Sequence, residues 1–145
     1  MARSYRELLV WQKAKALAVQ TYKATTDFPR TETYGLTSQI RRASVSVVSN
    51  IAEGQGRLTP GEFQHFLGQA RGSLLEAETQ LAIALDLGFV GRETDEALER
   101  ESYQVLGLLD RLIKCPASKA NRRKALKAPT QTLARVALVF ETLKL

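Results

Sequence analysis

The sequence predicts an all-α protein: an antiparallel up-down-up-down four-helix bundle with a basic C-terminal extension. Three observations support this fold class. Four segments carry apolar residues at alternating spacings of three and four, the pattern of a helix with one buried face. Proline, glycine and capping residues separate these segments, and none shows the apolar–polar alternation of a strand. The connections are short, which favours antiparallel neighbours.

The first helix is expected from about Tyr5 to Thr26. Its apolar stripe consists of Val10, Ala14, Leu17, Thr21, Ala24 and Phe28. Pro29 ends the helix, because the residue before a proline is disfavoured in the α region.

The second helix, within residues 34–57, is written mostly in small residues. Its apolar stripe is Leu36, Ile40, Ala43, Val47, Asn50 and Gly54. A polar stripe beside it contains Gln39, Arg42, Ser46, Ser49 and Glu53. Small polar side chains allow a neighbouring helix to approach closely. Gly54-Gln55-Gly56 is interpreted as the end of this helix, because no strand and third glycine accompany it as a phosphate loop requires.

The third helix has the clearest signals. Thr59-Pro60-Gly61-Glu62 predicts an N-cap, a proline in the first turn and a capping-box glutamate. Its stripe is Phe63, Leu67, Ala70, Leu74, Ala77, Leu81 and Ala84, and Gly88 is the predicted stop. The fourth helix is expected from around Thr94 to a point before Pro116, with acidic residues in its first turn.

Residues 1–114 form the predicted bundle, and residues 115–145 form a separate basic tail. The bundle carries 14 Lys and Arg against 14 Asp and Glu, whereas the tail carries seven against one, so the net charge of +6 lies in the tail. Residues 1–57 sum to +5 and residues 58–114 to −5. The two halves either neutralise each other or form a basic face for an anionic partner. The tail either contains a short helix after Pro129 or stays disordered.

The expected location is the cytoplasm. The single cysteine, Cys115, cannot form an internal disulfide, which suits a reducing compartment. Charges interrupt every apolar run before it reaches the roughly 18 to 20 residues of a membrane span. Lys13 and Lys15 closely follow the first apolar run, so neither a signal peptide nor a membrane partner is expected.

Three blocks of sequence resemble a known bacterial family. They are LLVWQKA near the start, FPRTETYGLTSQIRRASVSVVSNIAEGQGR in the middle and EFQHFLGQARGSLLEAETQLAIALDLGF in the third helix. In this order they are similar to four-helix-bundle proteins whose first members are encoded in intervening sequences of 23S ribosomal RNA genes. A related member is the accessory variability determinant of diversity-generating retroelements. The resemblance covers roughly residues 5–114, and family members usually stop near the end of the fourth helix.

The resemblance implies a four-helix bundle that assembles into a barrel-like homopentamer without enzymatic activity. The retroelement relative works beside a reverse transcriptase and binds nucleic acid through a basic surface. The expected partners are therefore copies of the same chain, RNA or DNA, and a nucleic-acid enzyme such as a reverse transcriptase.

Basic side chains are the candidate nucleic-acid contacts, because a guanidinium or an ammonium binds phosphate. The candidates are Lys13, Lys15, Lys23, Arg30, Arg41, Arg42, Arg57, Arg122, Arg123, Lys124 and Lys127. Arg41 and Arg42 point about 100° apart on a helix, so they cannot both serve one face. The alternative for this pair is that one arginine forms an ion pair with an acidic residue of the third helix, such as Glu76 or Glu78, inside the bundle or across a subunit interface. The alternative for the whole set is a solvated face.

Four further residues are predicted to have structural or interface roles: Asn50, Glu53, Gly68 and Gly72. The Asn50 amide is a candidate for fixing helix register. The two glycines, one turn apart, indicate a close helix crossing or an interface. No metal is expected, because the Glu62–His65 pair occurs once and di-iron bundles need such a pair twice. No catalytic residue or cofactor is expected either, since the serines of these helices have no histidine partner on an adjacent predicted turn.

The sequence thus predicts a non-enzymatic homo-oligomer that binds RNA or DNA through repeated basic side chains. Sequence specificity is expected to be low, because no base-reading module or aromatic platform is visible. The alternative is a protein-interaction scaffold or accessory subunit without direct nucleic-acid contact. The neutral body and the small-residue helix faces favour that alternative.

Overall fold

The computed structural model describes residues 4–114, which form four long helices and two short 3₁₀ turns. The helices are α1 (Leu9–Ala24), α2 (Leu36–Gln55), α3 (Pro60–Asp86) and α4 (Arg92–Lys114). The turns are η1 (Tyr5–Glu7), which precedes α1, and η2 (Arg30–Glu32), which lies in the α1–α2 connection. No strand occurs between residues 4 and 114. The predicted all-α four-helix bundle is confirmed. The predicted basic tail, residues 115–145, lies outside the described residues.

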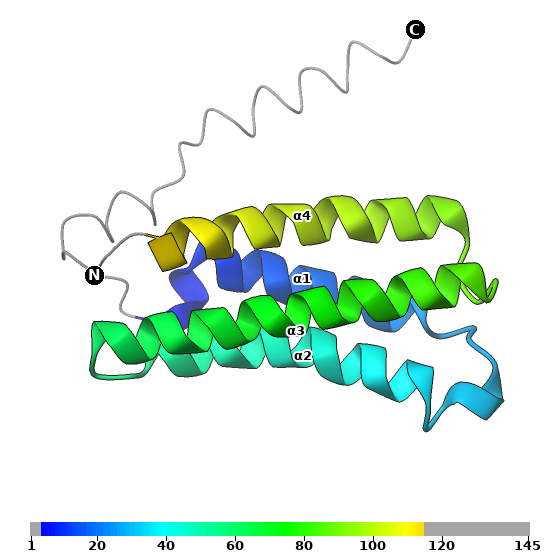
Figure 1. Ribbon diagram of the computed structural model, residues 1–145, viewed down its shortest axis with the longest axis horizontal. Coiled ribbons are helices and arrows are strands. Elements are labelled where there is room, and N and C mark those ends of the chain that lie inside the picture. Colours follow the sequence, from blue (N-terminus) through cyan, green and yellow to red (C-terminus); the bar gives the residue numbers. More distant parts are fainter. Residues whose placement is uncertain (1–3, 115–145) are drawn as a thin grey trace, which may run out of the picture.

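Consecutive helices run antiparallel, and each helix lies beside two others (Figure 1). α2 packs against α1 and α3, and α4 closes the bundle by packing against α3 and α1. The largest apolar side chains that are fully buried are Leu8, Ile40, Val47, Ile51, Leu67, Leu74, Val105 and Leu109. Burying one Leu or Ile side chain contributes roughly 1.5–3 kcal/mol to stability. None of the helices in the described part is long and apolar enough to cross a bilayer.

α1 is shorter than the predicted helix over residues 5–26. Ser4 caps η1 by accepting a hydrogen bond from the Arg6 amide, and Leu8 then adopts an extended conformation with φ −74° and ψ 122°. This break separates η1 from α1 and leaves Leu8 only 1% exposed in the core. At the other end, the Thr25 hydroxyl donates to the Thr21 carbonyl at 2.9 Å, just past the last helical residue.

The start of α3 is the predicted capping box. Thr59 Oγ1 accepts from the Glu62 amide at 3.2 Å, and the Glu62 carboxylate accepts from the Thr59 amide at 3.2 Å. The helix ends at Asp86, and Gly88 follows with φ +75°, a conformation that side chains with a Cβ rarely adopt. α4 begins at Arg92, two residues before the predicted start, with Glu93 and Asp95 in its first turn.

The buried stripe of α2 differs from the predicted stripe at one position. Asn50 was expected on the apolar seam, but it is half-buried and Ile51, 0% exposed, occupies the core instead. Both positions border the seam in a helix of 3.6 residues per turn. Burial of the aliphatic side chain is favourable, whereas burial of an amide is costly unless every polar atom finds a partner.

Gly54 allows the closest approach of α2 to α3. A Cβ at this position would lie 2.7 Å from the Phe66 Cβ and 3.2 Å from a Phe63 ring carbon. Gly68 and Gly72, by contrast, are exposed, and a Cβ on either would meet nothing within 4 Å. The close crossing expected at these two glycines is therefore not found between helices of the described chain. An interface between copies at these positions stays a prediction.

Replacing a glycine by alanine should raise the free energy of unfolding at Gly68 and Gly72 and lower it at Gly54. In an exposed helix interior, Gly→Ala stabilises by about 0.5–1 kcal/mol, so we expect this gain for Gly68→Ala and for Gly72→Ala. Gly54→Ala should instead destabilise, because overpacking costs about 1–3 kcal/mol and exceeds the gain in propensity. Urea denaturation followed by circular dichroism measures all three. A stabilised Gly54→Ala variant would show that α2 and α3 are farther apart.

Candidate nucleic-acid interface

α1 concentrates positive charge. Lys13, Lys15 and Lys23 lie within Leu9–Ala24, and this helix contains no acidic residue. The helix forms because Val10, Ala14, Leu17, Ala18 and Thr21 recur on one face and are buried, which leaves the lysines on the remaining surface. The three lysine side chains therefore point in different directions around α1 and do not form a single row.

Lys13 and Lys15 point in different directions. The half-buried Lys13 donates through Nζ to Gln104 Oε1 of α4 at 2.9 Å. Lys15 is exposed, and its Nζ lies 5.0 Å from the centre of the Trp11 ring, one turn earlier. Lys13 thus links α1 to α4, whereas Lys15 keeps its ammonium hydrogens available to an anion.

A shallow groove runs between α1 and α2. Lys15 and Lys23 border it, and its floor is apolar. Val19, Tyr22 and Val45 are 49%, 43% and 42% exposed there. The groove therefore combines exposed apolar surface with positive charge, and both an anionic polymer and a protein segment have something to contact.

The adjacent arginines of α2 have different environments. Arg41 reaches the end of α1, where Nε donates to Thr25 Oγ1 at 2.8 Å and one terminal nitrogen donates to the Tyr22 carbonyl at 3.3 Å. Its guanidinium carbon lies 4.6 Å from the centre of the Tyr22 ring. Arg42 is exposed. The 100° separation on the helix thus leaves one arginine bound to α1 and the other facing solvent.

The predicted ion pair of this arginine pair with Glu76 or Glu78 is not present within the described part of the chain, and the same pair across a subunit interface stays a prediction. Glu76 accepts from Gln80 Nε2 at 3.1 Å, and Glu78 accepts from the Ser102 hydroxyl. Arg41 binds the Tyr22 carbonyl and the Thr25 hydroxyl at the α1 C-terminus instead of a carboxylate. A helix C-terminus carries partial negative charge, so it suits a guanidinium.

Three more candidates are exposed or paired at the surface. Lys23 and Arg30 are exposed, and their side chains form no hydrogen bond or ion pair with any residue between 4 and 114. Arg57 forms an ion pair with Glu53 at 2.5 Å and lies 4.7 Å from the centre of the Phe66 ring. Both partners are about half exposed, so this pair contributes little to stability. The tail candidates Arg122, Arg123, Lys124 and Lys127 lie outside the described residues.

Asn50 belongs to a small polar network between α2 and α3. Its amide donates to the Ser46 carbonyl at 2.9 Å and to the Ser46 hydroxyl at 3.0 Å, within its own helix. The Ser46 hydroxyl in turn lies 3.0 Å from the Ser73 hydroxyl of α3. The link across the two helices is therefore made by two serines, and Asn50 orients one of them.

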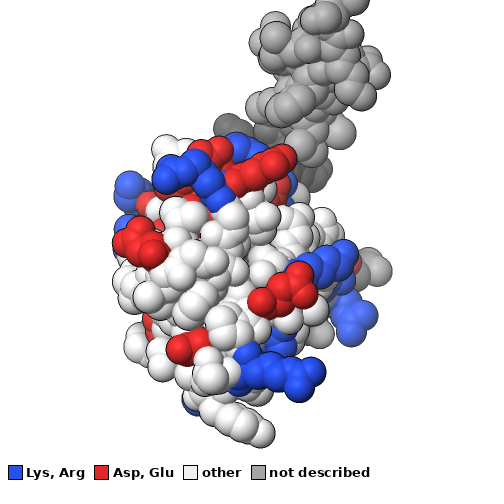
Figure 2. Space-filling model, turned by 90° about the vertical axis from the view of Figure 1, so that its right-hand side faces the viewer, with Lys and Arg blue, Asp and Glu red and all other residues white. Residues whose placement is uncertain are grey.

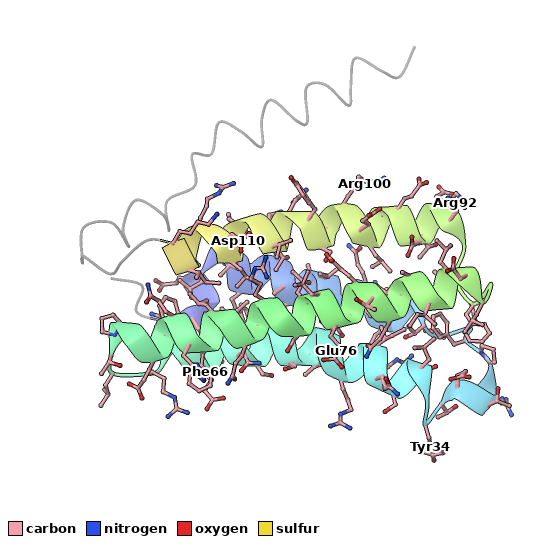
Figure 3. All side chains as sticks on the ribbon, viewed as in Figure 1. Tyr34, Phe66, Glu76, Arg92, Arg100 and Asp110 are labelled. Carbon is pink, nitrogen blue, oxygen red and sulfur yellow. The ribbon has the colours of Figure 1, made fainter. Side chains whose placement is uncertain are left out.

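α1 and α2 form one layer of the bundle, and α3 and α4 form the other, which carries most of the acidic residues. At the end of the bundle with the α1–α2 and α3–α4 connections, both signs of charge lie around an uncharged centre (Figure 2). Tyr34 projects away from the bundle at this end (Figure 3) and is 98% exposed, a feature that the helical periodicity could not reveal. This end does not carry a patch of a single sign.

His65 has a local partner. One ring nitrogen lies 2.9 Å from Gln69 Nε2, and the ring stacks edge-on with Phe66. Glu62 is used as the cap of α3. Between residues 4 and 114, no three His, Cys, Asp or Glu side chains converge as metal ligands.

The Arg41 contacts predict that Arg41 contributes more to stability than its neighbour Arg42. Arg41→Ala should lower the free energy of unfolding by about 1–2 kcal/mol, because it removes a charged donor from two oxygens of α1. Arg42→Ala, the matched control, should change it by less than about 0.5 kcal/mol, as exposed positions usually do. Chemical denaturation gives both values. Equal effects would mean that Arg41 does not link α1 to α2.

Comparison with known proteins agrees with this fold. The family model described as "23S rRNA-intervening sequence protein" matches residues 6–111. A crystal structure of a protein of unknown function from the S23 ribosomal protein family of Bacteroides thetaiotaomicron VPI-5482 is similar, with a TM-score of 0.67 and 24% identity. The match covers 74% of this chain and 100% of that one, and at this identity it concerns the fold. A comparison with curated proteins gives no match. Because the family match spans most of its length, this chain belongs to the 23S rRNA-intervening sequence protein family.

Proposed function

We propose that this chain forms a non-enzymatic cytoplasmic homo-oligomer that binds RNA or DNA with low sequence specificity. The observation that carries the proposal is the basic face of α1 and α2, which we define as Lys15, Lys23 and Arg42. All three side chains are exposed, and α1 contains no carboxylate to neutralise them.

The basic face has a geometry suited to a phosphate backbone. Lys15 and Lys23 are eight residues apart on α1, which corresponds to roughly 12 Å along the helix axis. Arg42 lies on the same stripe of α2 as Val45 and Ser49, which line the groove beside Lys15 and Lys23. Contacts of this kind neutralise phosphates without reading bases, so they give salt-dependent and weakly specific binding.

Repetition in an oligomer would strengthen such weak contacts. The family resemblance favours a homopentamer, in which each basic side chain occurs five times. Linked sites act at high effective concentration, so affinity can rise by orders of magnitude without any new contact. The exposed Gly68 and Gly72 on α3 offer a face where another copy can approach closely.

Tyr34 adds a contact of a different kind. This residue is 98% exposed and follows η2, the turn that contains the exposed Arg30. An exposed aromatic ring can stack on an unpaired base, and such stacking is tolerant of sequence. It supports a preference for nucleic acid with single-stranded segments.

Removing the basic face should lower affinity for nucleic acid. We expect the variant Lys15→Gln/Lys23→Gln/Arg42→Gln to bind a labelled structured RNA more weakly than the unaltered protein. The slope of log affinity against log salt should become shallower by about two, because each lost phosphate contact removes roughly 0.7–0.9. Fluorescence anisotropy over a salt series measures both quantities.

A matched control removes the same charge from α4. Arg92, Arg100 and Arg111 are exposed, and the first two lie along the outer side of that helix (Figure 3). Arg92→Gln/Arg100→Gln/Arg111→Gln should leave most of the affinity. Equal losses in the two variants, or no binding by the unaltered protein at low salt, would exclude the proposed face.

The assembly and the tail are tested together. Removal of residues 115–145 should lower RNA affinity strongly, because all of the net charge of +6 lies there, and should leave the number of subunits unchanged. Light scattering should give about five times the 16.1 kDa chain mass for the full protein. A truncated protein with fewer subunits would assign the tail to assembly, and a full-length monomer would contradict the oligomer.

The second candidate is a protein-interaction scaffold or accessory subunit. The apolar floor of the α1–α2 groove favours it, since Val19, Tyr22 and Val45 are each more than 40% exposed. Val19→Ser/Val45→Ser changes the floor but not the charge. A bound protein that survives nuclease treatment and is released by this variant would support the scaffold instead of nucleic-acid binding.

A further inference from the structure

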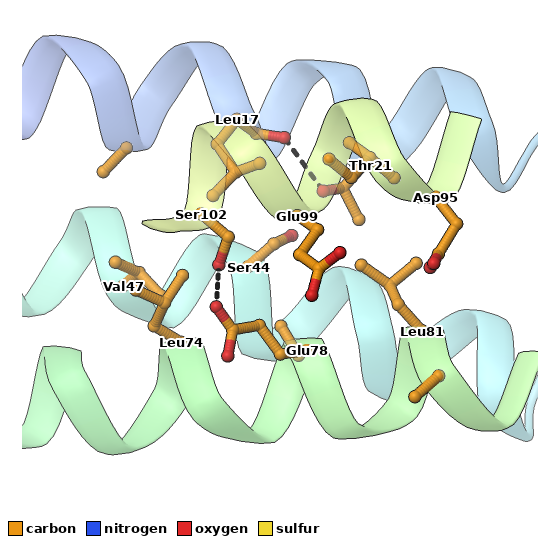
Figure 4. Close-up of a pocket in the computed structure, with 14 residues that line it drawn as sticks. Leu17, Thr21, Ser44, Val47, Leu74, Glu78, Leu81, Asp95, Glu99 and Ser102 are labelled. Carbon is orange, nitrogen blue, oxygen red and sulfur yellow. Dashed lines mark hydrogen bonds between the residues drawn. The ribbon is translucent and has the colours of Figure 1, made fainter. Parts of the chain in front are cut away.

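A cavity of about 110 Å³ lies inside the bundle and opens between α3 and α4 (Figure 4). Its inner wall is apolar and comes from all four helices. Leu17, Val47, Leu74 and Leu98 contribute to it, and each is at most 7% exposed. At the opening, Glu78 and Ala82 of α3 face Asp95 and Glu99 of α4, and both Ala82 and Glu99 are exposed. The cavity is thus an apolar pocket with carboxylates at its mouth.

The polar atoms of the cavity are acceptors. The hydroxyl groups of Thr21 and Ser44 donate to the carbonyls of Leu17 and Arg41, each at 2.9 Å, and Ser102 donates to Glu78. Each hydroxyl proton is therefore used within the protein, while the oxygen retains acceptor capacity. Ionised carboxylates accept only. A ligand that satisfies this lining has to supply hydrogen-bond donors.

The negative charge at the mouth of the cavity favours ligands whose hydrogen-bond donor is cationic. Glu78, Asp95 and Glu99 bring three carboxylates to one opening, and no basic residue lines the cavity. Burial raises the pKa of Asp95 above its ordinary value, and the negative charge of Glu99 raises it further, with Glu96 adding to this and Arg92 opposing it. A cation seated here would relieve the repulsion between the carboxylates, so a charged donor is preferred over a neutral alcohol.

The volume limits the apolar part of the ligand. An apolar cavity of 150 Å³ holds the six carbons of benzene, so by proportion about 110 Å³ holds roughly four or five carbon atoms. The inner leucines and valine provide no partner for a second charge, and an unpaired buried charge is costly. The tail of the ligand is therefore a short hydrocarbon chain.

We propose that this cavity binds a primary alkylammonium ion with a four- or five-carbon chain. The hydrocarbon chain occupies the apolar interior, and the ammonium group lies at the mouth, where it donates to the Glu99 carboxylate and is also attracted by the negative charges of Glu78 and Asp95. The mouth of this cavity lies on α3 and α4, away from the basic face, so the proposal does not depend on nucleic-acid binding.

The test uses the full-length protein with methyl-labelled leucine and valine. Titration with n-pentylammonium chloride should give saturable shifts of the methyl signals of Leu17, Leu74 and Leu98, with a Kd on the order of 1 mM for so small a ligand. Pentanoate should cause none, and n-pentanol should bind at least several-fold more weakly. 1,5-Diaminopentane should also bind more weakly, because its second ammonium would enter the apolar interior.

Two variants with matched controls examine the two halves of the site. Ala82→Leu should abolish the shifts by filling the opening, while Ala16→Leu, an equal enlargement at an exposed position of α1, should not. Glu99→Gln should raise the Kd roughly two- to fivefold, and Glu96→Gln, on the same helix but outside the cavity lining, should raise it less. Circular dichroism confirms that each variant is folded.

The outcomes distinguish specific binding in the cavity from non-specific attraction of a cation to an acidic surface. Tighter binding of the diamine than of n-pentylammonium, or equal effects of Glu99→Gln and Glu96→Gln, would overturn the proposal in favour of surface electrostatics. Absence of saturable methyl shifts in the unaltered protein would also overturn it. Saturable shifts lost in Ala82→Leu and kept in Ala16→Leu would support it.

Discussion

The close approach of α2 and α3 is the constraint on which the rest of the bundle depends. Two helices can approach this closely only where the facing side chains are small, and Gly54 provides that space against Phe63 and Phe66. Farther along, the facing hydroxyls of Ser46 and Ser73 lie 3.0 Å apart, so the contact continues through small polar groups. α1 and α4 then cover the other side of this pair and complete a core around Leu74.

The order of charges along the chain gives the bundle two chemically different layers. The basic residues of α1 and α2 and the acidic residues of α3 and α4 lie on different helices of one bundle. Ion pairs do not cancel this separation, because none between residues 4 and 114 joins the two layers. Arg57 at the end of α2 pairs with Glu53 of α2, and Arg71 of α3 pairs with Asp110 of α4. An anion and a cation are therefore attracted to different layers. Both attractions weaken as salt screens the charges.

The fold was predictable because it follows from local patterns. The capping box at Thr59 and Glu62, the stop at Gly88 and the apolar spacing of each segment require no knowledge of distant residues. The sequence could also show that Arg41 and Arg42 face different directions. It could not show that Arg41 reaches Thr25 and Tyr22, because that contact depends on how far α1 extends before its last turn.

Other features depend on the three-dimensional packing of several helices. Lys13 was grouped with the phosphate-binding candidates, yet its ammonium group contacts Gln104, 91 residues away. The exposed environment of Gly68 and Gly72 depends on which face of α3 is turned outward. The cavity is a volume left by side chains from four helices, and no spacing along the chain encodes a volume. A helical wheel, which describes one helix at a time, misses all three.

The topology also bears on how the chain folds during synthesis. α2 and α3 are neighbours in sequence, so closing the short connection between them costs little entropy and their pairing is fast. The α1–α4 contact joins the two ends of the bundle and has to wait until the ribosome has released α4. At 5–20 residues per second this delay is on the order of ten seconds. During that interval the nascent chain presents the uncovered side of α1 to chaperones.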